Sequence, residues 1–260
     1  MFLIKLGGSV ITDKAKECCF KQETMDRLAA ELSKAKTEII LIHGAGSFGH
    51  ILAKKYSLND GFKRKIQLKG FALTQATVQR LNTLVLASLH HYNIPAVSIP
   101  PHAILSLSNH APTTVDYSLF KRYLSLGFMP VCFGDVVLDK KLGFSICSGD
   151  LLMHQLAVAL QPEKVIFVLD EDGVYSANPK TDRNATFIET ATARELKRLT
   201  TKRNAHADVT KGMEGKLSTI RQIAKEGVDT ILLNGNIHNR LYDTLKGKKV
   251  KCTLVYGDRA

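Results

Sequence analysis

Hydrophobic positions form two alternating patterns along the chain. Short, almost continuously apolar runs predict buried strands. These runs are Phe2–Leu6, Glu38–His43, Ala96–Ile99, Pro130–Phe133, Val165–Leu169, Asp229–Leu233 and Lys251–Tyr256. Between them, apolar residues recur at the i, i+3, i+4, i+7 spacing of an amphipathic helix. The clearest sets are Met25, Leu28, Ala29 and Leu32, then Val78, Leu81, Val85 and Leu89, then Leu217, Ile220 and Ala224. Apolar strands that alternate with helices predict an α/β fold with a mainly parallel sheet covered on both faces.

A shorter pattern interrupts this alternation. Val136–Leu138 and Gly143–Ile146 flank a turn-like stretch, Asp139–Leu142, which predicts an inserted β-hairpin. The chain shows no internal repeat and no low-complexity linker. We therefore expect a single domain, residues 1–260, with two lobes that meet near residue 161.

Composition adds a charge to this picture. The 260 residues include 36 Lys and Arg against 24 Asp and Glu, a formal net charge of +12. With 45% hydrophobic and 23% charged residues, the chain resembles soluble globular proteins, which excludes wholesale disorder. A basic surface suits phosphate-bearing partners, but it does not distinguish nucleic acids, membranes and small molecules.

Several features that the sequence lacks indicate where in the cell the protein is located. No apolar run reaches the ~20 residues of a membrane-spanning helix, and the first residues lack the features of a signal peptide. The five cysteines, Cys18, Cys19, Cys132, Cys147 and Cys252, show no metal-ligand spacing. We expect a cytoplasmic protein with reduced thiols and without a membrane partner.

Three glycine-rich turns each follow a predicted strand or precede a predicted helix. They are Lys5–Ser9, His43–His50 and Ser148–Asp150. Glycine permits the close backbone approach that a phosphate requires, and a helix N-terminus adds free N–H groups. For any one loop, a tight strand-to-helix connection explains the glycines equally well. The chain has no Walker-type P-loop, and the Gly44–Gly49 match to a dinucleotide-binding fingerprint lacks the acidic residue that should follow it.

Lysines accompany these turns. Lys5 ends the first strand, Lys14 follows a few residues later, and Lys216 lies at the start of a predicted helix. Phosphoryl transfer needs cations and N–H groups placed along the transferring group rather than covalent chemistry from the protein. Surface lysines are common in so basic a chain, so each one alone has an ordinary explanation.

Taken together, these segments resemble the amino acid kinase superfamily. Lys5–Ser9 is similar to its first phosphate loop, and Asp170–Tyr175 with Asn178-Pro179 is similar to its nucleotide-binding segment. Asp208–Lys216 is similar to its D-V-T-G-G-M-x-x-K element. Within the superfamily, the isopentenyl phosphate kinase branch is indicated by six further segments. They are Gly46–His50, Phe133–Asp135, Ser148–Asp150, Gly70–Gln75, Pro95–Ser98 and Asn234–Asn236.

The resemblance implies a fold and an activity. The fold would be a three-layer α/β/α sandwich with a mainly parallel central sheet and an inserted β-hairpin, commonly a homodimer. Residues 1–160 would form the lobe for the acceptor substrate and residues 161–260 the nucleotide lobe. The implied reaction is ATP-dependent phosphorylation of isopentenyl phosphate, a small phosphate monoester, to the diphosphate in the alternative mevalonate route. Mg²⁺ would be carried mainly by ATP, without dedicated metal ligands on the protein.

The same resemblance assigns residues. Lys14, His50 and Lys5 would be catalytic, with Lys14 acting on the transferring phosphoryl group and His50 positioning the acceptor as a hydrogen-bond donor. The ATP-binding set is Lys5, Leu6, Gly7, Gly8, Ser9, Gly46, Asp170, Asp172, Gly173, Tyr175, Gly212 and Lys216. The acceptor phosphate would be bound by Ala45, Gly46, His50 and Gly149. Asp150 would organise the lysines, although a helix cap or a first-turn acid is an alternative explanation.

The acceptor's apolar tail requires a pocket beside its phosphate. Candidates for that pocket are Phe71, Thr74, Val131 and Ile146, and at these spacings the same residues are equally typical of a core. Three positions depart from the family pattern. Lys211 replaces a usual glycine, and Leu169 and Glu171 replace Thr and Val.

Two other functions fit parts of the sequence. Ser47–His50 also resembles fosfomycin kinases, so another small-molecule kinase of the superfamily stays an alternative. A nucleic-acid-binding protein would use the basic clusters Lys63–Lys65, Lys197-Arg198, Lys202-Arg203 and Lys246–Lys251. These clusters lack interleaved aromatic residues and any recognisable nucleic-acid motif, which favours solvated faces and no specific nucleic-acid partner.

Overall fold

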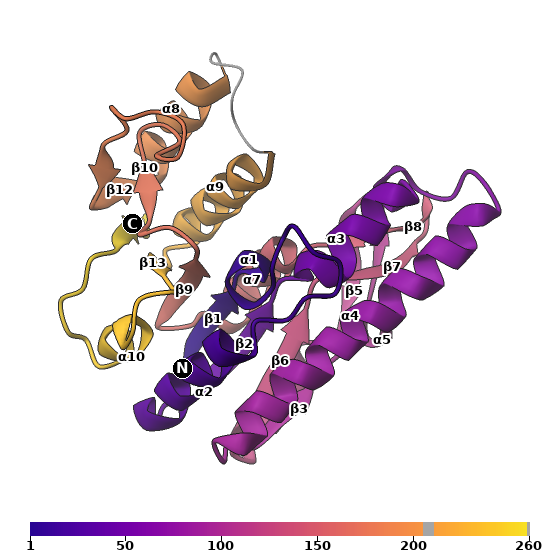
Figure 1. Cartoon of the computed structure of the whole chain (residues 1–260), viewed down its shortest axis with the longest axis horizontal. Coiled ribbons are helices and arrows are strands. Elements are labelled where there is room, and N and C mark those ends of the chain that lie inside the picture. The colour runs from indigo at the N-terminus through magenta and orange to yellow at the C-terminus, as the bar shows by residue number, and fades with distance from the viewer. Residues whose placement is uncertain (205–210, 259–260) are drawn as a thin grey trace.

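The computed structural model describes residues 1–204 and 211–258 (Figure 1). Within them, an eight-stranded sheet has the strand order β12-β14-β13-β9-β1-β2-β6-β3. Its strands are β1 (Phe2–Leu6), β2 (Ile39–His43), β3 (Ala96–Ser98), β6 (Met129–Phe133), β9 (Lys164–Leu169), β12 (Thr190–Thr192), β13 (Thr230–Asn234) and β14 (Thr253–Tyr256). All neighbouring strands run parallel except β13 and β14, which are antiparallel. The mainly parallel sheet predicted from the apolar runs is confirmed.

The two faces of the sheet pack against different sets of helices. Side chains of β1 point to opposite faces in turn, so Ile4 packs with one apolar cluster and Leu3 with the other. The first cluster includes residues of α2 (Gln22–Ala35), α4 (Ile66–His91) and α10 (Arg240–Leu245). The second includes residues of α6 (Ser118–Ser125), α7 (Gly149–Leu160), α8 (Ala193–Asn204) and α9 (Lys211–Lys225). The three-layer α/β/α arrangement follows from these two cores.

The predicted hairpin forms part of a larger sheet. Strands β7 (Asp135–Asp139) and β8 (Gly143–Cys147) pair antiparallel, with Val136 opposite Ile146. The sheet has the order β5-β4-β7-β8 and includes β4 (Leu105–Ser108) and β5 (Ala111–Val115), which the sequence analysis missed. Both missed strands are short and contain Ser, Thr or Pro, so neither forms a continuous apolar run.

The remaining elements are small. They are α1 (Gly8–Ile11), α3 (Gly46–Lys55), α5 (Pro101–Ile104), a 3₁₀ turn (Leu58–Asp60), β10 (Val174–Tyr175) and β11 (Phe187–Ile188). The division of the domain at residue 160 stays a prediction. That residue ends α7, and the next strand, β9, pairs directly with β1 of the first half. No helix in the described part of the chain is long and apolar enough to span a lipid bilayer.

Candidate active site

A cleft of about 1250 Å³ lies where β1, β2 and β9 end and where α3 and α7 begin. Ligands of open α/β sheets bind at this edge, because the carboxyl ends of parallel strands and the helix N-termini meet there. Most of the predicted site residues line the cleft. They are Lys5, Gly7, Gly8, Ser9, Lys14, Ala45, Gly46, His50, Thr74, Ile146, Gly149, Asp150, Asp170, Gly173, Tyr175 and Lys216.

The glycine loops touch one another through their backbones. A Cβ atom on Gly8 would lie 2.6 Å from both the N and Cα atoms of Gly46, and one on Gly44 would lie 2.7 Å from the Gly8 nitrogen. Gly46 also has a φ of +50°. Any side chain at these positions would push the β1 and β2 loops apart. The glycines therefore allow two strand-to-helix turns to form one continuous wall of backbone.

The third glycine turn joins this wall. Gly134 donates a hydrogen bond from its N–H to the His43 carbonyl, at 3.0 Å. A Cβ atom on Gly134 would approach the backbone nitrogens of Gly149 and Ala45 at 3.3 and 3.6 Å. The starts of α3 and α7 thus lie close together. A helix N-terminus leaves several backbone N–H groups without intrahelical partners; here the Thr12 hydroxyl already accepts from Ser47 N–H and the Ser148 hydroxyl from Leu151 N–H. This arrangement is typical of an anion-binding site.

Asp150 links two lysines from distant elements. Lys5 shares with Leu3 the β1 face that α7 and α9 cover, and Asp150 lies in the first turn of α7. The Asp150 carboxylate accepts a hydrogen bond from Lys5 Nζ at 2.5 Å and one from Lys216 Nζ at 3.3 Å. The Ser148 hydroxyl caps α7 by accepting a hydrogen bond from Leu151 N–H, so Asp150 is not the helix cap. It is the bridge between the two cations.

Burial makes this cluster electrostatically unusual. Lys5 is 6% exposed, and burial, followed by repulsion from Lys216, lowers its pKa from 10.5 to about 8. Burial alone would raise the Asp150 pKa, but the Lys5 and Lys216 charges reverse that effect and lower it to about 2. Both lysine ammonium groups also lie over the Phe167 ring. An anion entering the cleft therefore meets two cations that one carboxylate holds in place.

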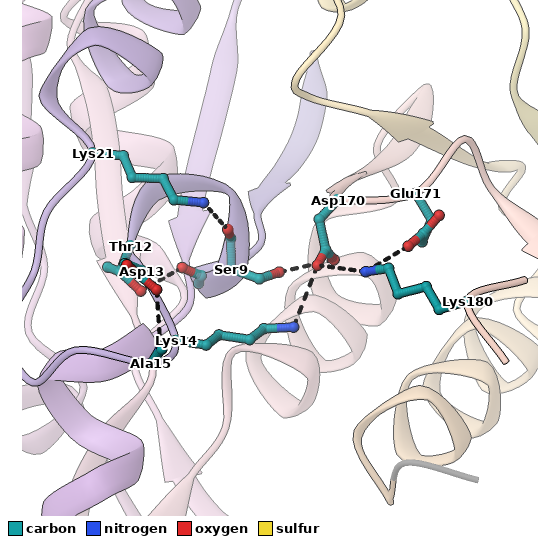
Figure 2. A network of polar contacts seen from close by, with 10 residues as sticks. Ser9, Thr12, Asp13, Lys14, Ala15, Lys21, Asp170, Glu171 and Lys180 are labelled. Atoms are coloured by element: carbon teal, nitrogen blue, oxygen red, sulfur yellow. Dashed lines mark hydrogen bonds and ion pairs between the residues drawn. The ribbon is translucent and has the colours of Figure 1, made fainter. Parts of the chain in front are cut away.

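A second charged group, which Figure 2 shows, also lines the cleft. The Ser9 hydroxyl donates to Asp170 at 2.9 Å, and Lys14 Nζ lies 3.4 Å from the same carboxylate. Lys180 Nζ lies 3.8 Å from Asp170 and 2.7 Å from Glu171. Burial would raise the Asp170 pKa, but Lys14 and the Ser9 hydrogen bond lower it. Lys14 and Lys180 are both largely exposed, so this group can rearrange more easily than the buried one.

The sequence analysis missed Lys180. It follows Asn178-Pro179 directly, so its place next to a recognised motif was a usable signal. Its ion pair with Glu171 also explains how the chain accommodates one of its departures from the family pattern. Both residues line the cleft.

His50 lies within α3, and its exposed side chain borders the cleft. Desolvation at the cleft wall, followed by repulsion from Lys5 and Lys14, lowers the His50 pKa. The lowered pKa favours the neutral imidazole, which has one ring N–H available to donate. A neutral imidazole agrees with the predicted role of donor and positioner.

Asp135 is a buried carboxylate in the cleft wall. Its Oδ2 lies 2.6 Å from Nδ1 of His102 on α5, and its Oδ1 accepts a hydrogen bond from Val136 N–H at 2.8 Å. Burial raises the Asp135 pKa despite these contacts. Asp135 lies at the start of β7, directly after Gly134, and its contact with His102 ties β7 to α5.

Four predicted site residues, Leu6, Phe71, Val131 and Asp172, are not among the residues that line the cleft, and their binding roles stay predictions. Asp172 is held by Arg240 at 2.6 Å and Lys251 at 2.7 Å, so it fastens the loop after β9 to the C-terminal part of the chain. Val131 and Leu6 are fully buried in the sheet core. Phe71 packs on Phe144, with ring centroids 5.2 Å apart.

The apolar part of the cleft therefore differs from the predicted one. Thr74 and Ile146 line it as expected, and Ala53, Val78 and Val136 complete it. These three were missed because the sequence does not show which strand face α3 and α4 cover. Gly212 lies in the first turn of α9. Asp208, Val209 and Thr210 of the predicted D-V-T element lie outside the described residues.

The site's carboxylates do not form a metal cage. Across residues 1–204 and 211–258, no group of three or more His, Cys, Asp or Glu side chains is arranged to hold a metal ion. Each carboxylate of the two charged groups is engaged by lysine: Asp150 by Lys5 and Lys216, Asp170 by Lys14, and Glu171 by Lys180.

The fold and the cleft, with its lysines and its wall of glycine backbone, can be compared with those of known protein families. The family model of the amino acid kinase family matches residues 1–234, and the chain belongs to this family. It is 37% identical to the isopentenyl phosphate kinase of Methanothermobacter thermautotrophicus, with 99% of each chain covered. It is 32% identical to the isopentenyl phosphate kinase of Arabidopsis thaliana, over 83% of this chain and 68% of the relative. A solved isopentenyl phosphate kinase structure superimposes with a TM-score of 0.87 at 35% identity, covering 98% of this chain and 99% of the other.

Proposed function

We propose that this protein transfers the γ-phosphoryl group of ATP to isopentenyl phosphate, forming isopentenyl diphosphate. The observation that carries the proposal is the composition of one cleft. Buried Lys5 and partly buried Lys216, bridged by Asp150, lie beside a glycine backbone wall, and an apolar wall lies at the acceptor side. The similarity to isopentenyl phosphate kinases over nearly the full chain supports the choice of acceptor.

Some residues of the site supply positive charge, and others position the phosphates. Lys5 and Lys216 neutralise phosphate oxygens, and the wall formed by Gly7, Gly8 and Gly46 lets the backbone approach them. Lys14, on an exposed loop, follows the phosphoryl group as its charge develops. The acceptor's phosphate oxygen is already anionic near pH 7, so no general base is required.

The acceptor is held at both ends. The N-terminal turns of α3 and α7 and the neutral His50 ring donate hydrogen bonds to its phosphate. Its short hydrocarbon tail lies against Ala53, Thr74, Val78, Val136 and Ile146. Fixing both ends aligns the attacking oxygen with the transferring phosphoryl group, which lowers the entropic part of the barrier.

The donor set fits a nucleotide that carries its own metal. The glycine wall would be filled by any Cβ, and Lys5 is buried and aimed at the cleft, so the site suits a polyphosphate. Bound Mg²⁺ supplies additional charge neutralisation on the phosphates. The lysine-engaged carboxylates leave this metal to be held mainly by ATP. A homodimer and a cytoplasmic location stay predictions from the sequence.

An acceptor panel tests the proposal. ADP release is measured with ATP and Mg²⁺ and, in separate reactions, isopentenyl phosphate, dimethylallyl phosphate, fosfomycin, UMP, glutamate and acetylglutamate. We expect kcat/KM to be highest for isopentenyl phosphate, with dimethylallyl phosphate next. A higher kcat/KM for fosfomycin, UMP or an amino acid would overturn the assigned acceptor while retaining the kinase. Absence of ADP with every acceptor would overturn the kinase itself.

A further inference from the structure

Large apolar side chains are exposed at the far end of the acceptor lobe. Phe62, in the loop before α4, is 46% exposed, Ile66 and Leu68 in the first turn of α4 are each 54% exposed, and Leu138 on β7 is 68% exposed. We call residues 62–69 and 138–142 the tip. Figure 1 shows the start of α4 and the β7–β8 hairpin at the same end of the molecule. Single exposed apolar residues are normal on a protein surface, but a group at one end needs an explanation.

Specific contacts hold the two segments of the tip together. Phe62 N–H donates to the Leu142 carbonyl at 2.7 Å, and the Phe62 ring lies 5.7 Å from the Phe144 ring. Leu138 is directly opposite Phe144 in the hairpin, so their side chains lie on the same face of that sheet. Phe62 of the first segment and Leu138 of the second therefore both lie beside Phe144.

A buried glutamine fixes the loop that precedes α4. The Gln67 Oε1 atom accepts hydrogen bonds from the backbone N–H groups of Lys63 and Arg64, at 2.7 and 2.9 Å. Its Nε2 group donates to the Gly61 carbonyl at 3.0 Å. Phe62 and the basic residues after it are thus presented on an ordered turn, which reduces the entropy lost when they meet a partner.

The polar residues of the tip are basic. Six exposed cationic side chains surround the apolar ones: Lys63, Arg64, Lys65, Lys69, Lys140 and Lys141. The tip's acidic residue, Asp139, is buried and accepts hydrogen bonds from the N–H groups of Asn109 and His110. The tip therefore presents positive charge around an apolar centre.

We propose that the tip is a docking surface for anionic lipid bilayers. Exposed phenylalanine and aliphatic side chains enter the interfacial region of a bilayer, while surrounding lysine and arginine side chains pair with anionic headgroups. Two copies of the chain that met tip to tip would place like charges against each other. Nucleic acid would engage the cations but would leave Ile66, Leu68 and Leu138 in water.

Docking at the tip leaves the catalytic cleft open. The cleft lining contains no residue of the tip. Phe144 contacts both Phe62 of the tip and Phe71 of α4, in the apolar cluster next to the acceptor wall. A bilayer at the tip therefore lies at the acceptor side of the molecule, and this inference does not depend on which acceptor is phosphorylated.

The chain contains no tryptophan, which allows a site-specific test. Phe62→Trp places one fluorophore in the tip. Phe128→Trp, at a residue 36% exposed just before β6, is its matched control. Vesicles of phosphatidylcholine with about 30% phosphatidylglycerol supply the anionic surface. We expect the emission of the Phe62→Trp protein to shift to the blue with these vesicles and to be quenched by brominated lipid chains. Phe128→Trp should show neither effect.

Charge variants complete the test by vesicle flotation. Lys63→Glu with Lys65→Glu adds acidic residues near the N-terminus of α4, where the helix dipole favours them, so the fold is retained. We expect these changes to weaken partitioning into anionic vesicles at least about tenfold. Lys121→Glu with Lys249→Glu, on other exposed faces, should weaken it much less. Ile66→Ser with Leu68→Ser should also reduce partitioning.

Three results would overturn the docking surface. The first is no partitioning of the unmodified protein into anionic vesicles. The second is equal loss in the Lys121/Lys249 and Lys63/Lys65 variants, which would indicate general electrostatic attraction. The third is tight RNA or DNA binding that the Lys63/Lys65 change abolishes and the Ile66/Leu68 change does not affect, which would assign the tip to nucleic acid.

Discussion

The two charged groups of the cleft differ in burial and therefore in the work they can do. The Lys5–Asp150–Lys216 group is largely withdrawn from water and is anchored on β1, α7 and α9. The Lys14–Asp170–Lys180 group lies on loops, with both lysine side chains mostly exposed. A buried group supplies fixed charge without reorganisation, whereas an exposed group can follow a moving phosphoryl group. On this comparison we propose phosphate binding for the first group and the transfer step for the second.

Removing the charge of Asp150 should have the largest effect. Asp150→Asn leaves Lys5 and Lys216 next to each other without their shared counterion, so both move away from the phosphates. We expect kcat/KM to fall by about 10²–10³-fold and the melting temperature to decrease. Steady-state kinetics and thermal unfolding measure the two effects. Asp243→Asn, which breaks the exposed pair with Lys248, should change neither appreciably.

Lys14→Ala tests the exposed group. Because Lys14 acts on charge that develops during transfer, kcat should fall by about 10²-fold while the Kd for ATP changes little. Lys16→Ala, an exposed lysine on the same loop, is the control and should behave like the unmodified protein. Loss of ATP affinity without loss of kcat would assign Lys14 to nucleotide binding instead.

Because the pKa of Lys5 is lowered, activity and stability should change in opposite directions as the pH rises. Its pKa of about 8 in the folded protein lies below the usual 10.5, so the unfolded chain binds more protons between these values. Lys5 therefore makes the free energy of unfolding rise with pH in this window. Phosphate binding weakens in the same window because the cation is lost, so kcat/KM for ATP should fall about tenfold per pH unit above the pKa. Kinetics and denaturant unfolding across pH 7 to 10 measure both slopes. Lys5→Arg, which stays charged, should remove this decline in kcat/KM.

His50 should contribute less than the lysines. His50→Ala removes a hydrogen-bond donor to the acceptor phosphate, so turnover with isopentenyl phosphate should fall about tenfold, with little change in ATP affinity. His50→Gln keeps a donor near the same place and should recover part of the loss. Unchanged turnover in His50→Ala would exclude the positioning role.

Lys180 should have the smallest effect. Its pair with Glu171 is exposed, and such pairs contribute about 0–1 kcal/mol to stability. Lys180→Ala should lower kcat/KM less than about threefold, and Glu171→Val should have a similar or smaller effect, as expected of a solvent-screened pair. A loss as large as that of Lys14→Ala would move Lys180 into the transfer step.

Local features of the sequence were sufficient to predict the backbone turns that form the site. The glycine turns and Lys5 lie next to strongly apolar strands, so motif and strand together located the cleft edge. Pairings between distant elements could not be predicted from local sequence features. Nothing in the spacing links Asp135 to His102, because they are 33 residues apart and only the folded chain brings α5 against β7.

The predicted site residues that do not line the cleft have a related explanation. Val131 was expected in the acceptor pocket, but the sequence does not show which neighbours cover a strand, and both faces of β6 are buried. Asp172 was assigned to the nucleotide because it lies in a nucleotide motif, while Arg240 and Lys251, which hold it, come from much later in the chain. The tip could not be predicted from the sequence for the same reason. The cluster Lys63–Lys65 resembles an ordinary solvated face until the hairpin adds Leu138, Lys140 and Lys141 beside it.

The central claim is that the cleft joins a phosphoryl group to the phosphate of isopentenyl phosphate. Phosphorus NMR of a reaction containing the protein, ATP, Mg²⁺ and isopentenyl phosphate tests it directly. The proposal predicts that the monoester signal is replaced by the two coupled signals of a new diphosphate, in a one-to-one ratio with ADP, and that Asp150→Asn slows this conversion strongly. ADP formation with an unchanged monoester signal would contradict it.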